Sequence, residues 1–213
     1  MTVRGSLIAA LRHLYENGWR LIVPNVAFAI ATIGALVAAS YAQPALLLLV
    51  AVGPFAATLM HCAVTVQQTD RLRLGDVLVG LRLHWRRGLA LGSLGAAMAV
   101  LAVTAVSFYA RLGVLAWPFA VVALYVAGMY VVWQIHLWPL AVARRTGLED
   151  VLREAGIGLL RRPLATFGLA LALLLVNAVA AIGVLPVLTF TIAYSALAVA
   201  HFVLPPPPEE AIT

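Results

Sequence analysis

Residues 21–69 read LIVPNVAFAIATIGALVAASYAQPALLLLVAVGPFAATLMHCAVTVQQT and contain no charged side chain. A bilayer core is crossed by one helix of roughly 20 apolar residues, so this stretch is long enough for two spans. Pro44 divides it, because proline can begin a helix but disrupts one when it lies in the interior. The stretch therefore predicts a transmembrane hairpin with helices over about 20–41 and 45–67.

Further uncharged runs of the same character lie between short clusters of charge. The last of them, 163–208, is long enough for two helices and is divided at Gly183 and Pro186. The runs predict spans over about 88–110, 113–139, 163–183 and 186–204. The fold class we predict is an all-α membrane protein with six transmembrane helices. A five-span alternative stays open, in which the last run forms a single tilted or broken helix.

The composition agrees with a membrane protein. Hydrophobic residues make up 64% of the chain and charged residues 10%, with a mean hydropathy of +1.03. About a quarter of the residues are charged in a soluble domain. All 14 basic residues are arginine, and the absence of lysine excludes a P-loop or a Schiff-base enzyme. The net charge of +6 is explained by membrane topology, so we expect no nucleic-acid partner.

The arginines predict the orientation of the chain. With six spans, both termini and the segments 68–87 and 140–162 lie on one side of the bilayer. That side holds 13 of the 14 arginines, and only Arg111 lies on the other. Because loops rich in Arg face the cytoplasm, we expect a cytoplasmic-membrane protein with both termini inside.

Three charged segments have apolar residues at helical spacing and are predicted to be amphipathic helices in the interface plane. They cover about 3–17, 71–87 and 148–162. The segments resemble one another: 11–18 aligns with 81–88, and 74–78 aligns with 148–152. The chain is therefore predicted to contain three parallel copies of an amphipathic helix followed by a transmembrane hairpin.

These copies form one predicted domain, 1–204, followed by a proline-rich acidic tail, 205–213. Gly88, Gly92 and Ala96 follow one another at four-residue spacing, which lets two helices approach closely. Packing within the chain and formation of a homo-oligomer would each explain this stripe.

The layout resembles the YesL-like bacterial membrane proteins. The resemblance lies in Gly53-Pro-Phe-Ala-Ala57, in the arginine- and aromatic-rich segment 81–92, and in Gln134-Ile-His-Leu-Trp-Pro139-Leu before a basic loop. It covers nearly the whole chain, although His61 and His136 stand where the family is expected to have tyrosine. The resemblance implies a role around carbohydrate uptake, with ABC sugar-transporter subunits as partners, and it supplies no catalytic residues.

Polar residues within the spans are the candidate ligand-binding residues. His61, His136 and His201 each lie near the cytoplasmic end of the second helix of a hairpin, and a pseudo-threefold axis would bring them together. Three histidines and a water can bind zinc, but each ring can equally bond a neighbouring carbonyl or a headgroup. Gln134 and Asn177 lie deeper and are predicted to form interhelical bonds or substrate contacts. We assign no metal and no cofactor.

A basic surface is the candidate docking site for a partner or for anionic lipid. It consists of Arg82, Arg86, Arg87, Arg161 and Arg162. We therefore expect a non-catalytic accessory component of a solute-transport system. Two alternatives are a self-contained carrier or channel, lined by Asn25, Gln134, Asn177 and Tyr194, and an intramembrane metal-dependent enzyme that uses the three histidines.

Overall fold

The computed structural model describes residues 2–183 and 187–205, and the regular structure in these ranges is entirely helical. The elements are α1 (Val3–Tyr41), η1 (Gln43–Leu48), α2 (Leu49–Thr69), α3 (Leu74–Arg111), η2 (Val114–Ala116), α4 (Trp117–Ala143), α5 (Leu148–Arg161), α6 (Pro163–Ile182), the π-helical η3 (Val187–Thr191) and α7 (Ile192–Val203). The predicted all-helical chain is thus confirmed. The predicted tail lies outside the described residues apart from Pro205.

Within the residues that the structure describes, five helices are long and apolar enough to cross a membrane. They are Val3–Tyr41, Pro44–Thr69, Leu74–Arg111, Val114–Ala143 and Pro163–Ile182. The sixth predicted span, 186–204, corresponds to a shorter apolar helix, Thr189–Val203. At 1.5 Å per residue this helix is about 22 Å long, against a hydrocarbon core of about 30 Å. Residue 186, where this span was predicted to begin, lies outside the described residues.

The first two amphipathic segments continue directly into the spans that follow them. α1 includes both 3–17 and 20–41, and α3 includes most of 71–87 and all of 88–110, so the predicted helix boundaries near residues 18 and 88 are wrong. The residue at each of these two positions is a glycine, which costs a helix about 1 kcal/mol relative to alanine but does not break it.

The third amphipathic segment is a separate helix, as predicted, because a proline follows it. Pro163 is the first residue of α6, and Arg162 before it has φ −138° and ψ 55°, outside the helical region. The α region is disfavoured for a residue that precedes proline.

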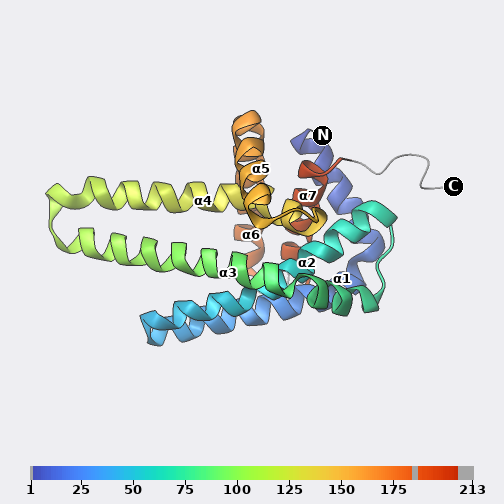
Figure 1. Ribbon diagram of the computed structural model, residues 1–213, viewed down its shortest axis with the longest axis horizontal. Coiled ribbons are helices and arrows are strands. Elements are labelled where there is room, and N and C mark those ends of the chain that lie inside the picture. Colours follow the sequence, from blue (N-terminus) through green and yellow to red (C-terminus); the bar gives the residue numbers. More distant parts are fainter. Residues whose placement is uncertain (1, 184–186, 206–213) are drawn as a thin grey trace.

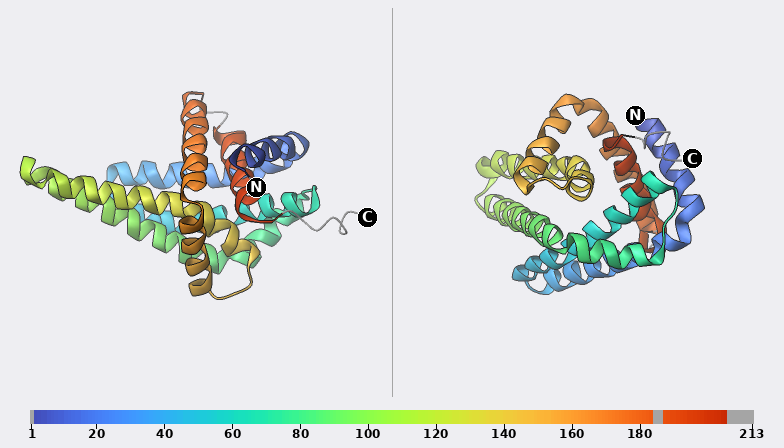
Figure 2. Two further views of the ribbon diagram at one scale, coloured as in Figure 1. Left: turned by 90° about the horizontal axis from the view of Figure 1, so that it is seen from above. Right: turned by 45° about the vertical axis from the view of Figure 1, so that its right-hand side comes forward.

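The α1–α2 and α3–α4 pairs are two helical hairpins. Figure 1 shows the turns of both pairs at one end of the molecule, opposite the start of α1 and the end of α7. α1 is bent along its course and contains Pro24, which cannot donate a backbone hydrogen bond within the helix. Figure 2 shows that α6 runs across the direction of the α3–α4 pair rather than along it.

α2 and α3 form the most extensive helix pair, and glycines make their contact close. A Cβ added to Gly92 would lie 2.6 Å from the carbonyl oxygen of Val50, and one added to Gly88 would lie 2.8 Å from the nitrogen of Pro54. Ala96 is buried on the same face of α3. The stripe therefore serves packing within the chain, one of the two explanations that the sequence left open.

The core lies where α2, α4 and α7 meet one another. Its fully buried side chains include Cys62, Leu137 and Leu197, one from each of these helices. The outer half of the α3–α4 pair has large exposed apolar residues, such as Leu101 and Leu124. Such a surface is expected where a helix faces lipid tails rather than water.

Candidate functional site

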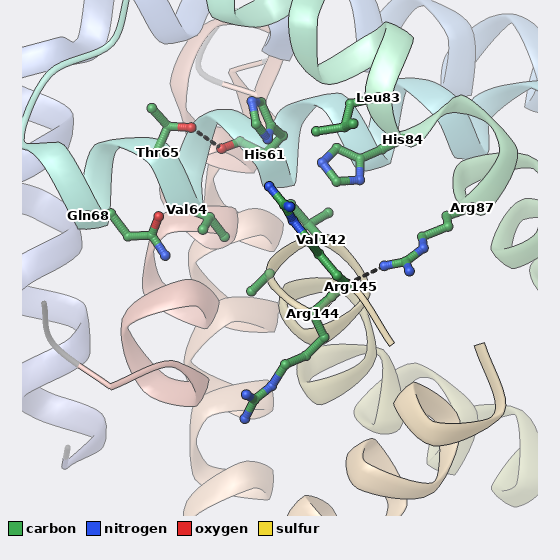
Figure 3. A pocket seen from close by; sticks show the side chains of 11 residues that line it. His61, Val64, Thr65, Gln68, Leu83, His84, Arg87, Val142, Arg144 and Arg145 are labelled. Atoms are coloured by element: carbon green, nitrogen blue, oxygen red, sulfur yellow. Dashed lines mark hydrogen bonds between the residues drawn. The ribbon is translucent and has the colours of Figure 1, made fainter. Parts of the chain in front are cut away.

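A polar pocket lies between α2, α3 and the end of α4. Its volume is about 640 Å³. Polar side chains from α2, from α3 and from the residues directly after α4 line it, as Figure 3 shows: His61, Thr65, Gln68, His84, Arg87, Arg144 and Arg145. No aspartate or glutamate is among the lining residues, so the pocket is basic.

Arg87 connects α3 to the end of α4. Its Nη1 donates to the carbonyl oxygens of Ala141, at 2.8 Å, and of Arg144. Its Nη2 donates to the carbonyl oxygen of Thr146 at 2.7 Å. The last carbonyls of a helix have no partner within it, and the guanidinium group supplies donors for them. Arg87 was predicted to be a docking residue, and the structure shows that its guanidinium group holds the α4–α5 connection.

Two histidines form one wall of the pocket. The ring centroids of His61 and His84 lie 5.1 Å apart. The His61 ring lies over Gly80, where an added Cβ would approach its Cδ2 to 2.7 Å. His84 is only 6% exposed, and its Nε2 has no hydrogen-bond partner among the described residues. His84 was not among the predicted site residues.

The two arginines after α4 differ in their partners. Arg144 Nη2 lies 3.0 Å from Glu154 Oε1 and forms an ion pair with α5. Arg145 makes no ion pair or hydrogen bond with any residue in the described ranges. In Figure 3 its side chain extends toward the rings of His61 and His84, while Arg144 points away from them.

His136 lies at a different place, between α4, α5 and α6. Its Nε2 is 2.9 Å from Thr166 Oγ1, and its ring lies over Gly158, where an added Cβ would approach Nδ1 to 2.8 Å. A second pocket of about 270 Å³ adjoins it, with Glu154 in its lining. Arg161 and Arg162 also line this pocket.

His201 lies at a third place, between α7 and the start of α1. Its ring contacts that of His13 edge to face, with centroids 4.8 Å apart. His13 Nε2 in turn lies 3.5 Å from Asp70 Oδ1. The structure therefore does not bring His61, His136 and His201 together. Within the described ranges, no group of three or more His, Cys, Asp or Glu side chains could hold a metal ion.

The deeper polar residues mostly bond between helices. Asn177 Nδ2 donates to Leu173 O in its own helix and to Ser195 Oγ of α7, each at 2.8 Å. Asn25 Oδ1 on α1 accepts from the backbone nitrogen of Ala193 at 2.7 Å, in the first turn of α7. Gln134 instead lines two largely apolar pockets of about 210 and 430 Å³. Its buried Oε1 has no partner among the described residues.

The other predicted docking residues are exposed. Arg82, Arg86, Arg161 and Arg162 form no ion pair with an acid in the part of the chain that the structure describes. The guanidinium carbon of Arg86 lies 5.2 Å from the centroid of the Trp85 ring, a cation–π arrangement.

Sequence reasoning missed His84, Arg144 and Arg145 as pocket residues. All three fall in segments whose charges were already explained by topology. The Leu81–Gly88 alignment contains His84, and the basic loop follows the Gln134–Leu140 motif, so both segments were noticed. Neither sequence pattern indicates that α3 and the end of α4 lie against α2.

Comparison of the chain with protein-family models, with curated proteins and with solved structures finds no match.

Proposed function

We propose that this chain is a non-catalytic multi-pass membrane protein that assists a solute-transport system. The observation that carries the proposal is the set of exposed arginines without acidic partners on α3 and at the end of α5, next to long apolar helices. Such cations are available to acidic groups of a membrane partner or of lipid. The resemblance to the YesL-like proteins supports a carbohydrate ABC transporter as the partner.

The proposal includes six spans in three parallel repeats, with both termini in the cytoplasm. Contacts among α2, α4 and α7 support it, since these are the second helices of the three hairpins. Each carries one of the histidines near its end, and each histidine packs against a different neighbour. His61 meets α3, His136 meets α5 and α6, and His201 meets α1, which is the order expected if the third repeat closes onto the first.

Asn17 and Arg87 give a second parallel between the repeats. Each directly precedes a glycine, and each binds the segment that follows the second helix of its own hairpin. Asn17 Nδ2 donates to Asp70 O at 3.1 Å, and the backbone nitrogen of Leu72 donates to Asn17 Oδ1 at 3.3 Å. Arg87 binds the carbonyls of Arg144 and Thr146, which follow α4, in the same way.

Single-cysteine labelling tests the topology. In a Cys62→Ala background, a membrane-impermeant maleimide is applied to intact cells expressing Arg4→Cys, Arg111→Cys or Pro205→Cys, which replace exposed residues. Six spans predict labelling at position 111 only, and labelling at 4 and 205 after permeabilisation. Labelling at 205 in intact cells, with 4 protected, would establish five spans.

Affinity purification from native membranes in mild detergent tests the accessory role. We expect a transporter subunit to co-purify with the wild-type chain and to be lost from an Arg82→Glu/Arg86→Glu variant. Arg111→Glu reverses the charge of an exposed arginine on the proposed opposite side and is the matched control. Recovery of the partner at equal yield from both variants would show that Arg82 and Arg86 are not part of the interface. Recovery of the chain alone from wild-type membranes would oppose an accessory role.

The self-contained carrier stays a second candidate because of Gln134. An amide with a free buried oxygen, set in apolar pockets of an apolar helix, is a polar group that a solute could use. Uptake of radiolabelled sugar into liposomes containing only this protein would support it. Loss of that uptake in Gln134→Leu, with normal reconstitution, would assign the path to these pockets.

A further inference from the structure

We propose that the pocket formed by α2, α3 and the end of α4 is a binding site for a phosphate-bearing anion. The proposal concerns this pocket alone and does not depend on the docking role of the exposed arginines. Its ligand is an oxyanion carried on a small molecule or on a lipid headgroup.

The first argument is charge. Three arginines and two histidines line the pocket without a carboxylate among them. The ion pair with Glu154 offsets the charge of Arg144, whereas the partners of Arg87 are neutral carbonyls. Asp76 acts on His61 electrostatically, and its carboxylate also accepts a hydrogen bond from the backbone of Arg73 at the start of α3. An anion in the pocket would therefore meet a net positive field.

The second argument is the unpartnered donor on His84. His84 lines the pocket, its side chain is more than nine-tenths buried, and its Nε2 is a buried atom without a partner among the described residues. Buried polar atoms nearly always have a partner, and leaving one unpaired costs roughly 1–3 kcal/mol. In the tautomer with hydrogen on Nε2, the ring donates to an anion oxygen.

The third argument is the direction of Arg145. Its side chain extends toward the two imidazole rings and is bonded to no other described group. A guanidinium group and a ring N–H that point into one space match the several oxygens of a phosphate, which accepts bonds from more than one direction. The amide of the exposed Gln68 lies on the opposite wall as a further donor.

The volume indicates what carries the phosphate. About 640 Å³ falls within the roughly 300–1,000 Å³ usual for small-molecule sites, and it exceeds what one phosphate needs. The remaining space suits the organic part of a soluble phosphate ester or the headgroup of an anionic phospholipid. Both sources share the chemistry of recognition.

The second pocket of the described structure is a natural comparison. It also has a histidine and arginines, but Glu154 lies in its lining and His136 Nε2 is already bonded to Thr166. Arginine alone therefore does not make such a site. We expect the second pocket to take no phosphate.

Two titrations of the purified full-length protein test the site. Inorganic phosphate is titrated by calorimetry in detergent, and binding to phosphatidylcholine vesicles with and without phosphatidic acid is measured separately. Arg145→Gln and His84→Phe should each weaken binding by about tenfold or more, because each removes a donor to a charged group. The matched control is Arg111→Gln, which removes the charge of an exposed arginine at the far end of α3, outside the pocket and outside the proposed docking surface, and it should bind like the wild type.

The two arms distinguish the sources of the ligand. Binding of inorganic phosphate that depends on Arg145 and His84 indicates a soluble phosphate ester. If only the binding to phosphatidic acid vesicles depends on Arg145 and His84, and inorganic phosphate does not bind, the ligand is a lipid headgroup. Arg145→Lys keeps the cation and should retain partial binding, which separates loss of charge from misfolding. Binding in neither arm, or binding that both pocket variants leave unchanged, would overturn the proposal.

Discussion

Gly88 of α3 lies directly against Pro54 of α2, so that a Cβ added to this glycine would come within 2.6 Å of the proline Cα. The backbones of the two helices are therefore in contact, and no side chain fits between them. This contact fixes where the first part of α3 lies along α2, and hence places His84 opposite His61.

Gly88→Ala should destabilise the protein. The new methyl group would meet backbone atoms, which cannot rotate away, and overpacking of this kind costs roughly 1–3 kcal/mol. The measurement is the temperature at which half of the detergent-solubilised protein is lost from the monodisperse peak. Gly128→Ala is the control, because nothing lies within 4 Å of the added Cβ and alanine favours the helix. Equal loss of stability in both variants would contradict the close contact at Gly88.

Arg87→Gln should loosen the connection between α4 and α5. Three backbone carbonyls lose their donors, and hydrogen bonds to a charged group contribute roughly 1.5–3 kcal/mol each. Limited trypsin digestion is a direct measurement, because trypsin cuts after arginine and Arg144 and Arg145 lie in this connection. We expect faster cleavage there than in the wild type.

Arg86→Gln is the control for that digestion, since Arg86 is exposed and makes no contact with the α4–α5 connection. If cleavage after Arg144 and Arg145 proceeds at the wild-type rate in Arg87→Gln, the guanidinium group is not what holds this segment.

Asn25→Leu should destabilise the start of α7. The backbone N–H of Ala193 would lose the oxygen that now accepts it, at a cost of roughly 1–3 kcal/mol for a buried group. Hydrogen–deuterium exchange should rise in the first turn of α7 and stay unchanged in α4. Unchanged exchange at residues 192–194 would show that another acceptor takes over.

Cys62 should be protected from thiol reagents in the folded protein. It is fully buried between α2 and its neighbours, so neither a membrane-permeant nor an impermeant maleimide can reach the sulfur. Mass spectrometry should find no adduct before denaturation and one after it. Rapid labelling of the native protein would mean that the core around α2 opens.

Several features follow from local sequence. The lengths of the apolar runs predict long apolar helices, because each run must be long enough to cross the hydrocarbon core. Pro44 and Pro163 mark helix ends, because proline acts on the residues beside it. The same local reasoning placed boundaries near residues 18 and 88 where none exist, since a change from polar to apolar sequence does not by itself end a helix.

The site depends on tertiary structure. Nothing in the spacing of His61 and His84, or of His13 and His201, indicates that these rings meet, because the contact depends on how each helix is rotated and where it crosses its neighbour. Arg87 looks like any other arginine at a membrane boundary until the end of α4 lies beside it. The sequence by itself determined that the chain is helical, apolar and asymmetric in charge, because each of these properties depends only on which residues occur within short segments. Only the packing of α2, α3 and α4 decided which of the charges surround a pocket, because residues far apart in the chain form its walls.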